Sequence, residues 1–289
     1  MTDRAAFLAG QGGWRVVRAL APDAGHRRYW RVARGAHTAV LVEDGQSLPA
    51  FLRMAEALRA HGFAAPEAYA AVPPFALLED FGDRPLRALP MAQALPHAVD
   101  VLRHFAACPD LLHALDLPHW AGSALQQKRG DFAPPSLAPS FESVWAEAES
   151  ALPPYMPVFT HADFHPDNLM ALPDGRVGLL DFQDALAAHP AYDLVNLLED
   201  ARTDVPKGLR ADMLQRYCAG MTPEDRRAFE VWYRVLGTQF HCRVWALFLR
   251  LGGTYAAHLP RLEAYIREAL PHPALGPVAR WFTDHAPAF

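Results

Sequence analysis

The sequence predicts an α+β fold with two lobes, in which a small antiparallel β-sheet precedes a larger and mostly helical part. Two patterns carry this prediction. Up to residue 82, apolar residues alternate over short runs separated by turn residues, which is typical of strands. Beyond residue 82 they recur at helical spacing over long windows. This change of pattern divides the chain into a lobe of residues 1–80 and a lobe of residues 81–289.

The first lobe is expected to hold five strands and one helix. The predicted strands cover residues 14–20, 29–33, 38–42, 68–72 and 75–78. Apolar residues at helical spacing, followed by Gly62, predict a helix over 48–61. Residues 79–82, Glu-Asp-Phe-Gly, are the expected connector to the second lobe.

The second lobe is expected to be helical around one β segment. The predicted helices cover residues 91–107, 140–152, 207–218, 223–251 and 259–270. Residues 157–182 predict a single compact β segment, in which a Pro-Asp-Gly turn joins two of the strands. Its short apolar strands cover residues 158–160, 169–171 and 177–180.

Composition and charge exclude several classes of protein. Of the 289 residues, 51% are hydrophobic and 20% are charged, which is an ordinary globular balance, and no apolar run is long enough to cross a bilayer. The formal net charge of -5 offers no basic excess for a phosphodiester backbone, so no nucleic-acid partner is expected. The three cysteines lie far apart without a C-x-x-C pair. We therefore expect a cytoplasmic protein without a disulfide framework and without a membrane partner, whose oligomeric state the sequence leaves open.

Polar side chains gather at the ends of the short strands in the second lobe. The segment 161–168 reads His-Ala-Asp-Phe-His-Pro-Asp-Asn, and Asp181, Gln183 and Asp184 follow after a strand and a turn. We expect these groups to meet at the mouth of one hairpin. Because removing a charge from water without a partner is costly, carboxylates at such a place indicate a bound cation or a reaction.

The spacing of these residues favours phosphoryl transfer. Asp163 and Asn168 stand five positions apart, and Asp181-Phe182 follows on the next strand, as in the H-R-D-x-x-x-x-N and D-F-G motifs of protein kinases. That chemistry needs one carboxylate to orient the attacking hydroxyl and two oxygen ligands to hold a magnesium ion on the phosphates. A metallohydrolase is the alternative, because His161, Asp163 and His165 alternate and can ligate zinc or a pair of metals.

The segment 159–200 resembles the superfamily of aminoglycoside phosphotransferases and choline kinases. The shared motifs are H-x-D-x-x-x-x-N, L-D-F-Q-D-A and A-Y-D-L-V-N-L-L-E-D. Within the superfamily the chain is most similar to the bacterial N-acetylmuramate/N-acetylglucosamine anomeric kinases of cell-wall recycling, through H-R-R-Y-W-R-V at 26–32, L-L-E-D-F-G at 77–82 and D-F-Q-D-A at 181–185. The resemblance implies a two-lobed protein-kinase-like fold, in which the first lobe binds the nucleotide and the second provides catalysis and the substrate site.

The resemblance also implies the roles of single residues. Asp163 is then the catalytic base, and Asn168 and Asp181 bind the magnesium ion of ATP. Adenine is received at the connector, which comprises Glu79, Asp80 and Phe81.

Supporting and substrate-binding roles follow from the same resemblance. His161 and Asp193 are implied to support the catalytic loop. The candidates for contact with a substrate hydroxyl are His165, Gln183 and Asp184, although His165 can instead cap the turn.

Two departures from the kinase pattern concern the phosphates. No G-x-G-x-x-G precedes the first hairpin, where residues 24–26 read only Ala-Gly-His, and the third strand carries no lysine. Since the first 127 residues contain no lysine at all, an arginine is the natural substitute, and Arg28 or Arg31 is placed to reach phosphate unless both are surface residues. Glu56, on the following helix, can pair with such an arginine or simply face solvent.

The leading hypothesis is an ATP- and Mg²⁺-dependent kinase of an amino sugar, N-acetylmuramate or N-acetylglucosamine. From residue 182 onward the chain has twelve acidic and twelve basic residues, which favours a neutral or anionic acceptor over a polycation. The alternatives are a kinase of an aminoglycoside, choline or homoserine, and a catalytically weak pseudokinase that binds nucleotide. The missing lysine motivates the pseudokinase, and the intact Asp163, Asn168 and Asp181 argue against it.

Overall fold

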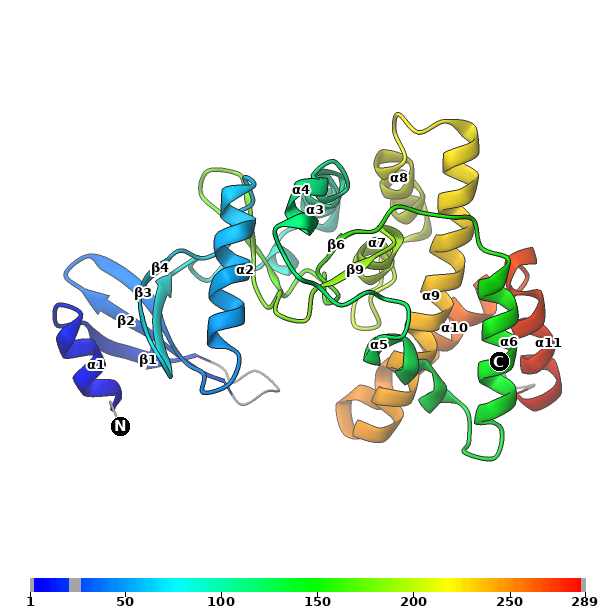
Figure 1. Cartoon of the computed structure of the whole chain (residues 1–289), viewed down its shortest axis with the longest axis horizontal. Coiled ribbons are helices and arrows are strands. Elements are labelled where there is room, and N and C mark those ends of the chain that lie inside the picture. Colours follow the sequence, from blue (N-terminus) through cyan, green and yellow to red (C-terminus); the bar gives the residue numbers. More distant parts are fainter. Residues whose placement is uncertain (1–2, 21–26, 287–289) are drawn as a thin grey trace. The chain divides into compact units, whose positions relative to one another are not determined.

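The computed structural model describes residues 3–20 and 27–286 and confirms the α+β fold class (Figure 1). The chain forms two compact units. Unit 1 comprises Met1–Leu89 and Pro166–Asp184, and unit 2 comprises Pro90–His165 and Ala185–Phe289.

Unit 1 contains an antiparallel sheet of five strands in the order β1-β2-β3-β5-β4. The strands are β1 (Arg15–Ala19), β2 (Arg28–Arg34), β3 (His37–Glu43), β4 (Ala68–Val72) and β5 (Phe75–Glu79). All five predicted strands are present. They form because β-branched, aromatic and small apolar residues alternate along them and Gly or Pro residues separate them.

Both faces of the sheet are covered at its central strands β3 and β5, because successive side chains of a strand point to opposite faces, whereas most residues of β1 and β4 are exposed. Ala39 and Leu41 of β3 pack with α1 (Arg4–Gly10), a helix that the sequence analysis did not predict. Val42 of β3 packs on the other face against Leu48 of α2 (Leu48–Ala60), which was predicted. The sheet therefore has one helix on each face.

Unit 1 also includes a two-stranded hairpin of β7 (Leu169–Ala171) and β8 (Val177–Leu179). Within the same unit, the Leu179 amide donates to the carbonyl of Ala64 at 2.7 Å, and the Ala171 amide donates to that of Arg84 at 2.8 Å. These hydrogen bonds attach the hairpin to the segments that flank the five-stranded sheet.

The prediction of a single β segment over residues 157–182 is wrong. β6 (Val158–Thr160) pairs with β9 (Leu186–Ala188) in unit 2, and β7 pairs with β8 in unit 1. Apolar runs of three residues predict strands, but they carry no information on which partner each strand takes. The polar groups therefore belong to two sheets rather than to the mouth of one hairpin.

Unit 2 is mostly helical, as predicted. Its α-helices are α3 (Met91–Ala106), α4 (Pro109–His113), α5 (Ala124–Gln127), α6 (Ala138–Ser150), α7 (Ala191–Leu198), α8 (Lys207–Tyr217), α9 (Pro223–Leu251), α10 (Leu259–Ala269) and α11 (Gly276–His285). All five predicted helices are present. The long helix α9 begins at Thr222, whose hydroxyl accepts from the Asp225 amide, and it ends at Gly252, where φ is 61°. Over residues 3–20 and 27–286, no helix combines the length and the apolar character that crossing a membrane requires.

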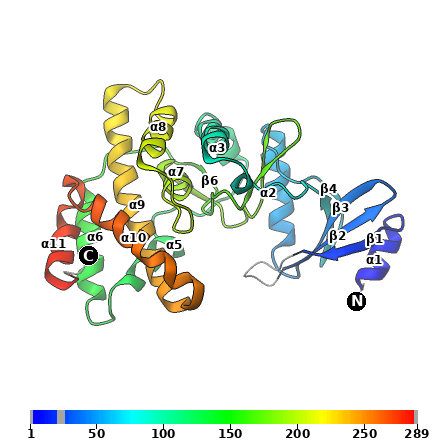
Figure 2. The ribbon, with the colours of Figure 1, turned by 180° about the vertical axis from the view of Figure 1, so that it is seen from behind.

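The core of unit 2 is aromatic. Phe141 and Trp145 of α6 pack with Trp281 and Phe282 of α11, and Figure 2 shows these two helices side by side. Val235 and Cys242 of α9 belong to the same cluster, so α9 forms one wall of this core.

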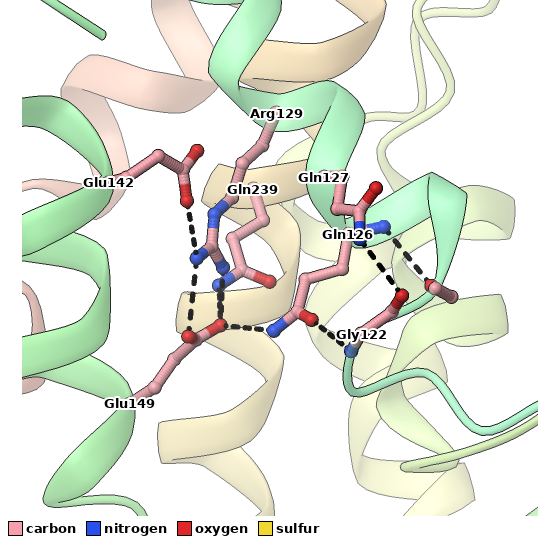
Figure 3. Close-up of polar contacts among 8 residues, drawn as sticks. Gly122, Gln126, Gln127, Arg129, Glu142, Glu149 and Gln239 are labelled. Carbon is pink, nitrogen blue, oxygen red and sulfur yellow. Dashed lines mark hydrogen bonds and ion pairs between the residues drawn. The ribbon is translucent and has the colours of Figure 1, made fainter. Parts of the chain in front are cut away.

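A buried polar network fixes the segment before α6 (Figure 3). Arg129, only 5% exposed, donates to both carboxylate oxygens of Glu149 and, at 3.1 Å, to Glu142. The amides of Gln126 and Gln239 donate to Oε1 of Glu149 at 2.9 and 2.7 Å. The network therefore joins α5, α6 and α9 around one carboxylate.

Replacing Arg129 with Met is expected to lower the free energy of unfolding by about 3 kcal/mol or more, because Glu149 is left largely buried without its cation. Urea denaturation monitored by circular dichroism measures the loss. Arg280→Met is the matched control, because Arg280 also pairs with a carboxylate of α6, Glu147, but both side chains are more than half exposed. It is expected to cost less than about 1 kcal/mol. Equal losses in the two variants contradict the role of the buried network.

Candidate active site

The loop after β6 in unit 2 is held in an uncommon backbone conformation. Ala162 has a φ of 72°, in the left-handed region that residues with a Cβ seldom adopt. The carboxylate of Asp193 in α7 accepts from the amides of His161 at 2.6 Å and Ala162 at 3.0 Å. Nδ2 of Asn196 donates to the carbonyl of Ala162 at 3.2 Å. The helix α7 thus fixes the backbone of the two residues that precede Asp163.

Asp163 is half-exposed and carries its charge at neutral pH. Nε2 of the buried His165 donates to Oδ2 of Asp163 at 3.2 Å. Burial, the largest single effect, raises the pKa of Asp163. The hydrogen bond and charge of His165, with smaller contributions from His161 and Arg202, outweigh it and lower the pKa to about 2. Asp163 is therefore a fixed carboxylate that can accept a hydrogen bond from a substrate hydroxyl.

The two residues predicted to support this loop are buried in unit 2. His161 is fully buried, and its ring packs edge-on against Phe164 with centroids 5.7 Å apart. Asp193 is 2% exposed, and burial raises its pKa to about 7 against the hydrogen bonds from the two backbone amides.

Unit 1 contains a pocket of about 350 Å³ between its sheet, α2 and the β7–β8 hairpin. Val40, Val42 and Leu78 of the sheet give it an apolar wall, and Met170 of β7 is also part of the lining. A pocket with an apolar wall and polar groups elsewhere in its lining is typical of a site for an organic ligand with an apolar, planar part, such as a nucleotide base.

Asn168 and Asp181 both line this pocket, at one end of the hairpin. The carbonyl of Asn168 accepts from the Leu180 amide at 2.9 Å, so the two residues sit on neighbouring chain segments. Asp181 has a φ of 60°, and its Oδ1 accepts from Nε2 of Gln183 at 2.6 Å. Amide and carboxylate oxygens are the ligands that Mg²⁺ prefers, so this pair fits a magnesium ion. Asp184 is exposed.

No zinc-type cluster accompanies these residues. In the two described stretches of the chain, no group of three or more His, Cys, Asp and Glu side chains is arranged to hold a metal ion. A magnesium ion bound with phosphates needs fewer protein ligands, because phosphate oxygens and water complete its shell.

The connector residues Glu79, Asp80 and Phe81 also line the pocket. Asp80 accepts from the Gly82 amide at 2.9 Å and from Nη2 of Arg31 at 2.9 Å, while Nε of Arg31 lies 2.7 Å from its second oxygen. Arg31 also binds Asp83 and the carbonyl of Gly82. The guanidinium of Arg31 is therefore engaged by the connector itself.

The ring of Phe81 contacts the β7–β8 hairpin at Gly178. A Cβ added at Gly178 of β8 would lie 2.7 Å from the Phe81 ring, which is closer than atoms can approach. Gly178 therefore permits the contact between connector and hairpin, a role that the sequence analysis did not recognise.

Arg27 is the pocket residue that the sequence analysis missed. It lines the pocket together with Tyr29 and Arg31, whereas Arg28 is exposed and is not among the described lining residues. Alternation along β2 explains this, because residues two apart share a face and Arg28 must point away from Arg31. The same alternation could have found Arg27 from the sequence. The expected phosphate loop, 24–26, lies outside the described residues.

These features define a phosphotransferase with a protein-kinase-like fold. A profile of the phosphotransferase enzyme family (APH) matches residues 16–232, and the chain belongs to this family. It is therefore an enzyme that transfers a phosphoryl group to a hydroxyl, as the sequence analysis predicted.

The chain is similar to a named kinase over nearly its full length. It is 32% identical to the N-acetylmuramate/N-acetylglucosamine kinase of Caulobacter vibrioides over 98% of this chain and 96% of that protein. The resemblance stated from the sequence motifs is thereby confirmed.

Solved structures agree on the fold. A choline kinase from Cryptosporidium parvum superposes with a TM-score of 0.64 at 12% identity, covering 93% of each chain. An aminoglycoside phosphotransferase, in a ternary complex with ADP and hygromycin B, gives 0.61 at 14% identity, covering 92% of this chain and 98% of that one. At these identities the two structures show the fold alone.

Proposed function

We propose that this phosphotransferase uses ATP and Mg²⁺ to phosphorylate the anomeric hydroxyl of an amino sugar, N-acetylmuramate or N-acetylglucosamine. The observation that carries the proposal is the 32% identity, along nearly the whole chain, to a kinase named for these two sugars. The proposed partners are ATP and this small-molecule acceptor, and the proposed compartment is the cytoplasm, where ATP is available.

The nucleotide is proposed to bind in the pocket of unit 1. Its apolar wall suits adenine, and Glu79, Asp80 and Phe81 are the proposed hinge that receives the base. Asn168 and Asp181 are the proposed ligands of magnesium, which when bound neutralises charge on the phosphates.

Asp163 is proposed to act on the acceptor. Its carboxylate accepts a hydrogen bond from the sugar hydroxyl and takes up the proton as the oxygen–phosphorus bond forms and the bond from the γ-phosphorus to its bridging oxygen breaks, releasing ADP. Because a carboxylate of pKa about 2 is a weak base, its main effect is to orient the hydroxyl for in-line attack.

The remaining candidate residues receive proposed roles from their contacts. His165, which is buried and donates to Asp163, positions that carboxylate. Asp193 and His161 hold the loop backbone. Gln183, which donates to Asp181, and the exposed Asp184 are the proposed contacts to acceptor hydroxyls.

The acceptor is tested by coupled release of ADP with N-acetylmuramate, N-acetylglucosamine, kanamycin, choline and homoserine, each with ATP and Mg²⁺. We expect turnover on the two acetylated sugars, with the phosphate on the anomeric carbon by ³¹P–¹H correlation. Turnover confined to kanamycin, choline or homoserine contradicts the amino-sugar proposal, and ATP binding without turnover on any acceptor favours a pseudokinase.

A further inference from the structure

A partly buried arginine stands at the polar end of the pocket in unit 1. The Arg27 side chain is only 13% exposed, and Nη1 lies 3.6 Å from Oδ1 of Asp181. Nε donates to Oδ2 of Asp44 at 2.9 Å, and Nη2 donates to the hydroxyl of Ser47 at 2.8 Å. One edge of the guanidinium is thus anchored, while Nη1 is directed toward the proposed magnesium ligand.

The anchor of Arg27 is itself fixed. Oδ1 of Asp44 accepts from the amides of Gln46 at 2.8 Å and Ser47 at 3.0 Å, just before α2. Burial, the largest effect, raises the pKa of Asp44, but hydrogen bonds from Ser47, Gln46 and Arg27 outweigh it and lower the pKa to about 2. Asp44 is therefore ionised and rigid, so it holds Arg27 in one orientation. Glu56 of α2, the acid considered from the sequence, is exposed instead.

The part of the pocket wall that β3 contributes carries no basic side chain to bind the phosphates of a nucleotide triphosphate. β3 contributes Val40 and Val42 to the lining, where most kinases place a lysine. Among the described lining residues the basic ones are Arg27 and Arg31, and Arg31 is engaged by Asp80, Asp83 and the Gly82 carbonyl. A guanidinium has five N–H donors, more than the contacts of Arg27 with Asp44, Ser47, Tyr29 and Asp181 require.

We propose that Arg27 binds the α- and β-phosphates of the nucleotide in place of the strand lysine, with Asp44 and Ser47 as positioning residues. This inference rests on the proposed nucleotide site and assigns its phosphate-binding cation. Most kinases pair a lysine on β3 with an acidic residue in the following helix. Here the corresponding ion pair is formed by Arg27, just before β2, and Asp44, before α2. Because one edge of the planar Arg27 guanidinium is already held, its other donors can bind phosphate oxygens with a smaller loss of side-chain entropy than a mobile side chain would suffer.

The test compares binding of ATP, AMP and adenosine by titration calorimetry with Mg²⁺. Arg27→Met is expected to weaken ATP binding about 10- to 100-fold, the effect of one or two charge-assisted hydrogen bonds, and to leave adenosine binding unchanged. Arg27→Lys, which keeps the charge, is expected to restore part of the ATP affinity. Arg53→Met, an exposed change on α2, is the surface control.

The outcomes separate this inference from the proposed function. If the unaltered protein binds no ATP, the proposed function fails. If it binds ATP more tightly than adenosine and Arg27→Met keeps that ratio, the inference fails, and it fails equally if Arg28→Met abolishes the ratio instead. If Arg27→Met does not fold, Arg27→Lys and Asp44→Asn are measured instead. An equal loss of ATP affinity and adenosine affinity in both variants overturns the phosphate role.

Discussion

Replacing Asp163 with Asn is expected to lower kcat by about 10²- to 10⁴-fold, because an amide cannot accept the hydroxyl proton and orients the acceptor poorly. Nucleotide affinity is expected to stay within a factor of about two, since the proposed ATP pocket belongs to unit 1 and Asp163 to unit 2. Steady-state release of ADP with saturating sugar measures kcat, and calorimetry measures the affinity. Asp212→Asn, an exposed change of the same chemistry on α8, is the matched control.

The pH dependence sharpens this prediction. With a pKa of about 2, Asp163 is ionised at every pH from 5 to 9, so the ratio of kcat between the unaltered and the Asp163→Asn protein should not vary over that range. A ratio that shrinks toward pH 5 contradicts the lowered pKa. Full turnover in Asp163→Asn would falsify its assignment as the base.

Replacing Asp181 with Ala is expected to weaken binding of the magnesium–ATP complex by at least ~10-fold, because it removes a proposed carboxylate ligand of a hard cation. The affinity for adenosine, which carries no phosphate, should not change. Because Asp181 has a φ of 60° and Ala tolerates the left-handed region poorly, Asp181→Asn is the better-behaved second variant. Titration of ATP at several Mg²⁺ concentrations measures the effect.

The control for this change lies on the same hairpin. Asp174 is an exposed carboxylate of the β7–β8 turn, so Asp174→Ala removes one charge without approaching the pocket lining. Loss of ATP affinity of equal size in Asp174→Ala, or an unchanged Mg²⁺ requirement in Asp181→Ala, contradicts the assignment of Asp181 as a ligand.

Elements with a clear period and clear ends could be predicted from the sequence. β3 alternates and α9 lies between Thr222 and Gly252, so both were found with bounds close to those observed. The helix α7 was missed as an element because all eight of its residues are buried, which leaves no polar face to mark its period. Strand pairing was missed where it depends on distant segments, as for β6 with β9.

Some residues of the candidate site could be predicted from the sequence and others could not. Motif spacing identified Asp163, Asn168 and Asp181, whose roles stay predictions until they are tested. It could not identify Asp44 or Asn196, because the residues they position, Arg27 and Ala162, are distant from them in the sequence. The lobe boundary at residue 80 also stays a prediction. Residues 166–184 pack with unit 1 because of hydrogen bonds to Ala64 and Arg84. The local sequence pattern does not predict these hydrogen bonds, because the partners lie far apart in the chain.

The contact between Phe81 and Gly178 couples two positions that are distant in the sequence. The size of the side chain at one position limits the size that the other can accept. A methyl group at 178 requires the Phe81 ring to shift, so a smaller residue at 81 is expected to make a larger residue at 178 easier to accommodate. The same constraint limits any attempt to reshape the proposed base-binding end of the pocket by directed evolution. Libraries that vary position 81 alone are expected to accept smaller side chains, whereas those that vary 178 alone are expected to favour glycine.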